Sequence, residues 1–199
     1  MREVPYLGRR YAAIASSIGV ILVVSGAIQA VPTLAAVWYP EETPRIPAFL
    51  LPAGIQTLLG LALRLAFRSR RTLELNVREG GVIVVAGWTI VILFSAWPFT
   101  TVLGLPFSRS VFESVSGWTT TGLSVVDVLG AGPMILLWRS VMQLAGGAGL
   151  AVIMMSALIG PAGTGISSAE GRGDQLVPQV KRSARMVLAV YLSYAAAGV

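Results

Sequence analysis

Long uncharged runs separated by short charged segments dominate the pattern of hydrophobic and polar positions. The runs cover residues 12–37, 47–63, 82–105 and 133–159. A helix needs about 20 mainly apolar residues to cross the hydrocarbon core of a bilayer. The pattern therefore predicts an all-α membrane protein with four spans, the first of them bent near its end at Pro32, which membrane helices tolerate.

A fifth apolar run begins at residue 185 or 186 and continues to residue 199. As a helix, residues 186–199 would rise about 21 Å, less than the roughly 30 Å of a hydrocarbon core. This run predicts the first part of another span. Overall composition agrees with a membrane protein, since 55% of the residues are hydrophobic and 12% are charged, with a mean hydropathy of +0.75.

The basic residues are distributed unevenly between the loops. Arginine and lysine are enriched in loops on the cytoplasmic side of membrane proteins. With four spans, twelve of the 15 basic residues fall on one side and predict a cytoplasmic N-terminus. They are Arg2, Arg9, Arg10, Arg64, Arg68, Arg70, Arg71, Arg78, Arg172, Lys181, Arg182 and Arg185. Because these residues lie between apolar runs, the net charge of +6 indicates membrane orientation, and we expect no nucleic-acid partner.

Residues 108–124, SRSVFESVSGWTTTGLS, lie between the third and fourth runs and are too polar to span a membrane. Ser110 and Glu113 have the spacing of a capping box, which predicts a short helix over residues 111–117. The β-branched run that follows weakens a helix, and Gly122 permits backbone angles that other residues resist. We expect residues 119–122 to form an extended segment whose carbonyl oxygens could replace the hydration shell of an alkali cation.

Several function classes lack the residues that they need. The chain has no cysteine and no histidine, so disulfides and thiolate chemistry are excluded, and zinc sites and histidine-based triads have no obvious residues. Residues 146–149 and 160–173 are glycine-rich but lack the spacing of nucleotide-binding loops. We expect a non-enzymatic protein without a cofactor, in which Gly146, Gly147 and Gly149 let the short helix approach the fourth span closely.

Three segments together resemble the first pore repeat of the Trk/Ktr/HKT superfamily of potassium transporters. They are LNVREGGVIVVAGWTIVILFSAWPF, SVFESVSGWTTTGLSVVDV and LLWRSVMQLAGGAGLAVIMMSALI. The resemblance covers nearly the whole chain and implies a helix pair followed by a helix, a re-entrant pore loop and a second helix. It implies three parts: residues 1–80 with the leading pair, 81–160 with the pore repeat, and 161–199 with a cytoplasmic linker and the start of a second repeat.

The family's selectivity filter falls on five residues of this chain. The resemblance implies that the backbone carbonyls of Thr119, Thr120, Thr121, Gly122 and Leu123 bind the ion, with potassium placed at Thr120, Thr121 and Gly122. Gly122 matches the glycine that is associated with potassium selectivity. The family carries four such repeats in one chain, whereas this sequence has one complete repeat and the start of another.

Two ionisable residues lie in or near the predicted membrane region, where such groups are usually paired. We expect Arg139, at the outer end of the fourth span, to pair with Glu113 on the short helix and fix its angle. The alternative is that both side chains reach interfacial water.

The sequence thus favours a potassium-translocating subunit of a Trk/Ktr-type system in the cell membrane. The resemblance implies a homodimer that binds a cytosolic nucleotide-binding regulatory subunit, with lipids around the spans. Two alternatives remain: a single-repeat cation channel that assembles as a tetramer, and a non-conducting membrane scaffold derived from a transporter.

Overall fold

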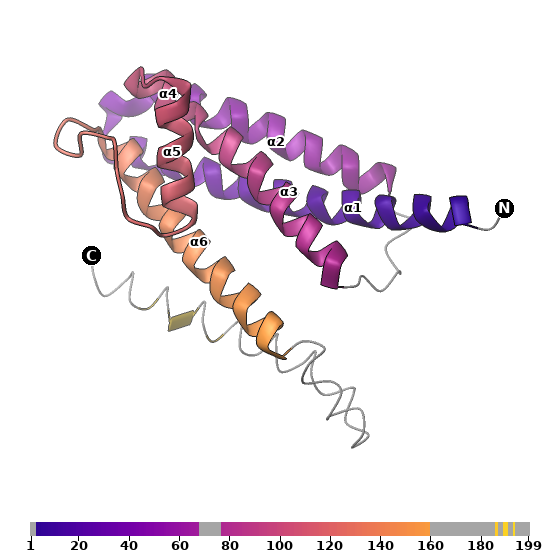
Figure 1. The fold of residues 1–199 in the computed structure, drawn as a ribbon. Helices are drawn as coiled ribbons and strands as arrows, with labels where there is room; N and C mark the ends of the chain where they lie inside the picture. Colours follow the sequence, from indigo (N-terminus) through magenta and orange to yellow (C-terminus); the bar gives the residue numbers. More distant parts are fainter. Residues whose placement is uncertain (1–2, 68–76, 160–185, 187–188, 191–192, 194–199) are drawn as a thin grey trace. The chain divides into compact units, whose positions relative to one another are not determined.

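The computed structural model describes residues 3–67, 77–159, 186, 189–190 and 193. Its described part is helical and contains no β-strand (Figure 1). In chain order the elements are α1 (Glu3–Ala30), η1 (Val31–Val37), η2 (Pro40–Arg45), α2 (Ile46–Ala66), α3 (Val77–Ser95), α4 (Trp97–Leu103), α5 (Phe107–Trp118) and α6 (Pro133–Ile159). The prediction of an all-helical protein is therefore confirmed for the described residues.

Three segments of the described residues are long and apolar enough to cross a membrane: Arg10–Val37, Pro40–Ala66 and Arg78–Leu103. They coincide with the first three predicted spans. The fourth predicted span, residues 133–159, has the same bounds as α6.

The predicted bend at Pro32 takes the form of a change in helix type. α1 ends at Ala30, and Val31–Val37 continues as a 3-10 helix with Pro32 at its start. Proline has no N–H, so the α-helical hydrogen bond that residue 32 would donate is missing. The chain therefore continues beyond Ala30 as the narrower 3-10 helix and remains helical up to Val37.

The third span differs from the prediction in one respect. Residues 82–105 were predicted as one span, closed near an interface by Trp97 and Pro98. In the structure α3 ends at Ser95 and α4 begins at Trp97, with Pro98 in its first turn. Ala96 keeps right-handed helical angles between them, so the break is local. Gly104, with φ of 65°, ends α4 in the left-handed conformation that glycine adopts without steric cost.

The prediction that Ser110 caps the short helix is wrong. α5 begins at Phe107, and the Ser110 N–H donates to the Pro106 carbonyl at 3.0 Å, so Ser110 lies inside the first turn. Pro106 therefore stands directly before the helix, and its carbonyl accepts the first hydrogen bond of α5. Ser110 is buried, and its hydroxyl accepts a hydrogen bond from Thr100 Oγ1 at 2.9 Å. α5 is 12 residues long, or about 18 Å at 1.5 Å per residue.

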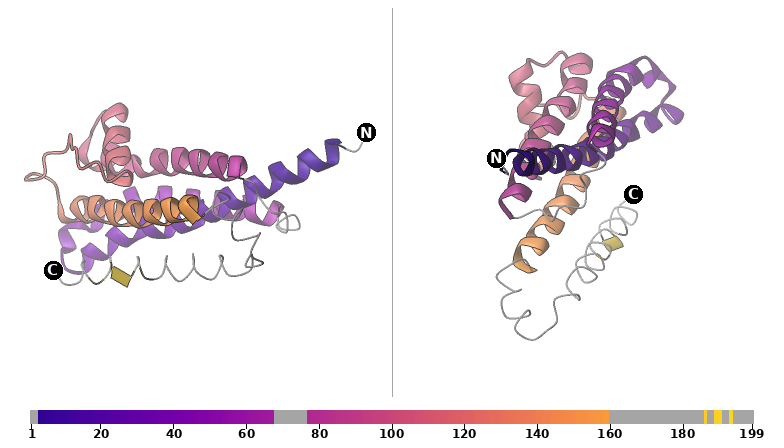
Figure 2. Two further views of the ribbon diagram at one scale, coloured as in Figure 1. Left: turned by 60° about the horizontal axis from the view of Figure 1, so that its bottom comes forward. Right: turned by 90° about the vertical axis from the view of Figure 1, so that its right-hand side faces the viewer.

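The leading helices pack closely. α1 contacts both α2 and α3, and α2 also contacts α4 (Figures 1 and 2). Gly19 on α1 and Gly60 on α2 allow this approach, because a Cβ built on either glycine would lie 2.6 Å from the carbonyl oxygen of the other. Small residues at helix contacts are typical of membrane helix pairs.

The chain divides into two compact units. One comprises Met1–Ser116 and Gly122–Val141, and the other comprises Gly117–Thr121 and Met142–Val199. This division differs from the three parts implied by the family resemblance, whose boundaries remain predictions. The start of the predicted fifth span and the linker before it lie largely outside the described residues.

Candidate functional site

Glu113 is a buried carboxylate in the segment between α4 and α6. It lies on α5, is 2% exposed, and accepts a hydrogen bond from Arg139 Nε on α6 at 2.6 Å. The predicted pairing of these two residues is therefore present. A buried carboxylate needs such a partner, because an uncompensated charge away from water is costly.

The same carboxylate also holds the chain that follows the threonines. The Val125 N–H donates to Glu113 Oε2 at 3.0 Å, and the Ser124 hydroxyl lies 3.1 Å from both carboxylate oxygens. Glu113 thus ties residues 124 and 125 to α5, while Arg139 ties α5 to α6. Hydrogen bonds to a charged group are about twice as strong as neutral ones, so this network can fix a segment that has no regular secondary structure.

Ser116 provides a second tie to the same segment. Its hydroxyl on α5 donates to the carbonyl oxygen of Leu123 at 2.5 Å. The Leu123 carbonyl is therefore directed to a protein donor. Neither Ser116 nor Ser124 was singled out from the sequence, although both flank the threonine run. Serine hydroxyl groups commonly form hydrogen bonds with nearby backbone, and this property could have identified both residues from the sequence.

The backbone between α5 and α6 takes unusual angles at alternate residues. Thr120 has φ of 55° and Gly122 has φ of 80°, and the described residues contain one other positive φ, at Gly104. A non-glycine residue in this conformation costs on the order of 1–3 kcal/mol. The segment is not a β-strand, and it opens with a turn in which the Thr120 N–H donates to the Gly117 carbonyl at 3.2 Å.

Residues 120–123 are exposed, and Leu123 retains 61% of its accessible surface. The described residues therefore leave this segment open on at least one side. They also contain no group of three or more acidic, histidine or cysteine side chains that could hold a metal ion.

The glycines of α6 differ in their surroundings. Gly146 is buried, and a Cβ there would collide with the carbonyl group of Trp118 at the end of α5. At Gly117 a Cβ would lie 2.9 Å from Met142 Cε. Gly149 has open space around its Cβ position. Close contact with α5 is thus present at Gly146 and absent at Gly149, and it remains a prediction for Gly147.

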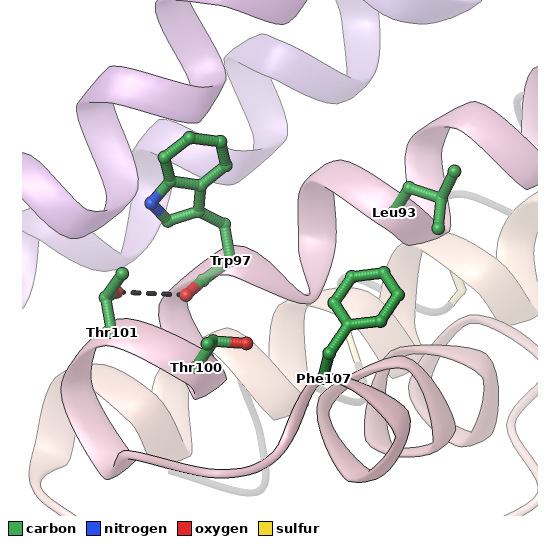
Figure 3. Close-up of a pocket in the computed structure, with 5 residues that line it drawn as sticks. All are labelled: Leu93, Trp97, Thr100, Thr101 and Phe107. Carbon is green, nitrogen blue, oxygen red and sulfur yellow. Dashed lines mark hydrogen bonds between the residues drawn. The ribbon is translucent and has the colours of Figure 1, made fainter.

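A separate pocket of about 390 Å³ lies beside α3, α4 and α5 (Figure 3). Its lining residues are Leu93, Trp97, Thr100, Thr101 and Phe107. The Thr101 hydroxyl donates to the Trp97 carbonyl at 2.9 Å, so this polar group is satisfied within α4. The lining is almost entirely apolar and does not suit a cation.

The family model and the known proteins that this chain resembles are all cation or potassium transport proteins. Residues 47–199 match the family model TrkH, described as a cation transport protein. Over 188 residues the chain is 27% identical to an uncharacterized cation transporter of Methanocaldococcus jannaschii, covering 92% of this chain and 38% of the relative. It is 32% identical over 168 residues to the Trk system potassium uptake protein TrkH of Halomonas elongata, covering 76% and 35%. The corresponding protein of Escherichia coli is 29% identical over 191 residues, covering 92% and 39%. The chain thus spans less than two fifths of these relatives' length.

Proposed function

The chain belongs to the TrkH family of cation transport proteins, and from this premise we propose that it is part of the potassium-translocating subunit of a Trk-type uptake system. Relatives from two bacteria are named potassium uptake proteins, which supports potassium as the transported ion. Members of this family are transporters and not enzymes. Neither the tetrameric channel nor the non-conducting scaffold is favoured by these similarities.

In this proposal the ion is bound by main-chain oxygens of Thr120, Thr121 and Gly122. The observation that carries it is the alternation of negative and positive φ at residues 119–122. In a regular strand, successive residues face opposite sides. Alternating backbone handedness instead turns neighbouring peptide groups toward one side, as in ion-binding backbone concavities. A row of carbonyls on one side can replace the water around an alkali cation.

The position of α5 supports the same proposal. Its C-terminus at Trp118 leads directly into Thr119, and the C-terminal end of a helix carries a partial negative charge. This end would attract a cation at residues 119–122. Leu123, whose carbonyl is held by Ser116, would serve as the anchor of the segment and not as a free ligand.

We further propose that this subunit lies in the cell membrane with a cytoplasmic N-terminus, and that residues 108–124 form a re-entrant loop entered from the outer side. The excess of basic residues in alternate loops supports this orientation. The homodimer and the cytosolic nucleotide-binding regulatory subunit remain predictions from the family resemblance.

Growth of cells that lack potassium uptake, at limiting potassium, tests the proposal. The cells would express the longest reading frame that contains this chain, either unchanged or with Gly122→Arg. We expect the unchanged protein to restore growth and Gly122→Arg to abolish it, because a bulky cation would occupy the ion's path.

Gly104→Arg is the matched control. Gly104 also has a positive φ, and like Gly122 it has open space at its Cβ position, so both substitutions impose a similar backbone strain. Protein levels in the membrane would be compared for both variants. Growth that survives Gly122→Arg would refute the filter assignment.

A further inference from the structure

Pro98 leaves one helix carbonyl without its usual partner. In a continuous α-helix the carbonyl of residue 94 accepts the N–H of residue 98, and proline has none to give. The side chain of Gln29, on α1, lies at this point: its Nε2 donates to the Phe94 carbonyl at 3.1 Å. Gln29 is completely buried. An amide from another helix therefore replaces the hydrogen bond that Pro98 removes.

The orientation of the Gln29 amide supports this role. Its Oε1 atom is buried and has no hydrogen-bond partner among the described residues. Rotating the amide would bring Oε1 against the Phe94 carbonyl, and two acceptors would then face each other. Leaving a buried polar atom unpaired costs about 1–3 kcal/mol. The side chain thus satisfies the Phe94 carbonyl while one of its own acceptors remains unpaired.

A second side chain holds the next carbonyl along the chain. Trp138 on α6 is completely buried, and its Nε1 donates to the Ser95 carbonyl at 3.2 Å. Its ring packs edge-on against Phe49, with centroids 6.4 Å apart. Two consecutive carbonyls at the break between α3 and α4 are thus bound from α1 and from α6.

The break is connected to α5 by a short series of contacts. α4 follows the break directly, and its Thr100 hydroxyl donates to Ser110 Oγ on α5 at 2.9 Å. One turn later on α5 lies Glu113, which binds the backbone after the proposed filter. The angle at which α4 leaves α3 therefore affects where α5 places Glu113.

We propose that Gln29 is a positioning residue for the filter: its amide substitutes for the N–H that Pro98 lacks and fixes the angle between α3 and α4, and so the place of α5. This proposal rests on the proposed function for its effect on transport. It assigns to α1, in the leading helix pair, a part in placing the pore segment that acts through α4 and α5.

A double-mutant cycle tests the pairing, using Gln29→Met, Pro98→Ala and both together in the longest reading frame. Methionine keeps the length of the side chain and removes the donor, whereas alanine at position 98 restores the missing N–H. We expect Gln29→Met to lower the melting temperature in detergent by about 3–6 °C. When Pro98→Ala is already present, Gln29→Met should lower the melting temperature by less than half as much. An equal loss in both backgrounds would overturn the pairing.

The ratio of potassium to sodium uptake, at equal amounts of folded protein, tests the positioning role. Gln29→Met should change this ratio, and Pro98→Ala should restore at least part of it in the double variant. The control is Gln56→Met: Gln56 is equally buried and also has an unpaired Oε1, but it donates to Ser25 within the leading pair. Gln56→Met should lower the melting temperature by the same amount with and without Pro98→Ala. It should leave the ratio of potassium to sodium uptake unchanged.

An unchanged ratio in Gln29→Met, or the same change in Gln56→Met, would overturn the positioning role. The melting comparison does not require transport. Absence of potassium uptake by the unchanged protein would therefore refute the proposed function. The melting temperatures would still decide whether Gln29 pairs with the break between α3 and α4.

Discussion

The Glu113 carboxylate has three partners in the described residues: the guanidinium of Arg139, the hydroxyl of Ser124 and the N–H of Val125. Each satisfies a lone pair that would otherwise be buried without a partner. A buried ion pair adds little net stability over an apolar pair of the same shape, but the loss of one member is severe. We therefore infer that the Glu113–Arg139 pair mainly fixes the position of α5 against α6. Removing one member should first reduce folding.

Arg139→Gln should lower the yield of folded protein by destabilising it by about 3–5 kcal/mol, because the Glu113 charge would remain buried without its counter-ion. The double variant Glu113→Gln with Arg139→Gln should recover part of this loss. Folded yield after detergent extraction, measured by size-exclusion chromatography, checks both. The control is Arg109→Gln, at an exposed position of α5, the helix that carries Glu113. Equal yields for Arg139→Gln and Arg109→Gln would contradict the prediction.

Gly146→Ala should destabilise the protein, because the added Cβ would collide with the Trp118 carbonyl, which belongs to the backbone and cannot rotate away. Overpacking of this kind costs about 1–3 kcal/mol. Gly149→Ala, one turn further along α6, meets nothing within 4 Å and should be neutral or stabilising. Thermal melting of the two variants gives the comparison. Identical melting temperatures would show that α5 and α6 do not meet at Gly146.

At the scale of elements, the leading helices are held by backbone proximity as well as by side chains. Gly19 and Gly60 face each other across α1 and α2, and Gly26 packs against Thr57 and the carbonyl of Ala53. In a bilayer, helix association depends on such close van der Waals contact, since lipid tails are as apolar as the helices. The pair is therefore sensitive to single methyl groups along this line.

Gly60→Ala should weaken the packing of α1 on α2, because its Cβ would lie 2.6 Å from the Gly19 carbonyl and 2.9 Å from the Val23 nitrogen. Gly54→Ala, in the same helix with open space around it, serves as control and should raise helix propensity without a clash. Limited proteolysis and thermal melting of the purified variants report the difference. A Gly60→Ala protein as stable as Gly54→Ala would contradict the close contact.

At the scale of the whole molecule, the distribution of basic residues should determine topology. A reporter that is active only outside the cytoplasm should be active when fused within Pro40–Arg45 and inactive when fused in the arginine-rich segment 68–78. The physical reason is the preference of arginine-rich loops for the cytoplasmic side. Matched expression of the two fusions, checked by immunoblot, provides the control. The reverse activity pattern would refute the proposed orientation.

The limits of span prediction are seen in α3 and α4. A run of apolar residues gives the length of a span because crossing a bilayer is a local requirement of about 20 residues. It does not show that Gln29, far earlier in the chain, replaces the hydrogen bond lost at Pro98. The Ser110 cap failed for a related reason: its spacing fitted a local motif, but the Pro106 carbonyl and Thr100 engaged the residue instead.

By itself the sequence determined the helical class, the approximate positions of the spans, the family and the segment that carries the proposed filter, because each depends on composition or on motifs within a short stretch. It also predicted the pairing of Glu113 with Arg139, since charges in a membrane region require partners. Only the tertiary structure decided which atoms meet across helices. The left-handed angle at Thr120, the tie from Ser116 to Leu123 and the pairing of Arg10 with Glu79 depend on residues brought together by folding. A single backbone angle, a hydrogen bond over seven residues and an ion pair over 69 residues leave no periodic signal in a single sequence.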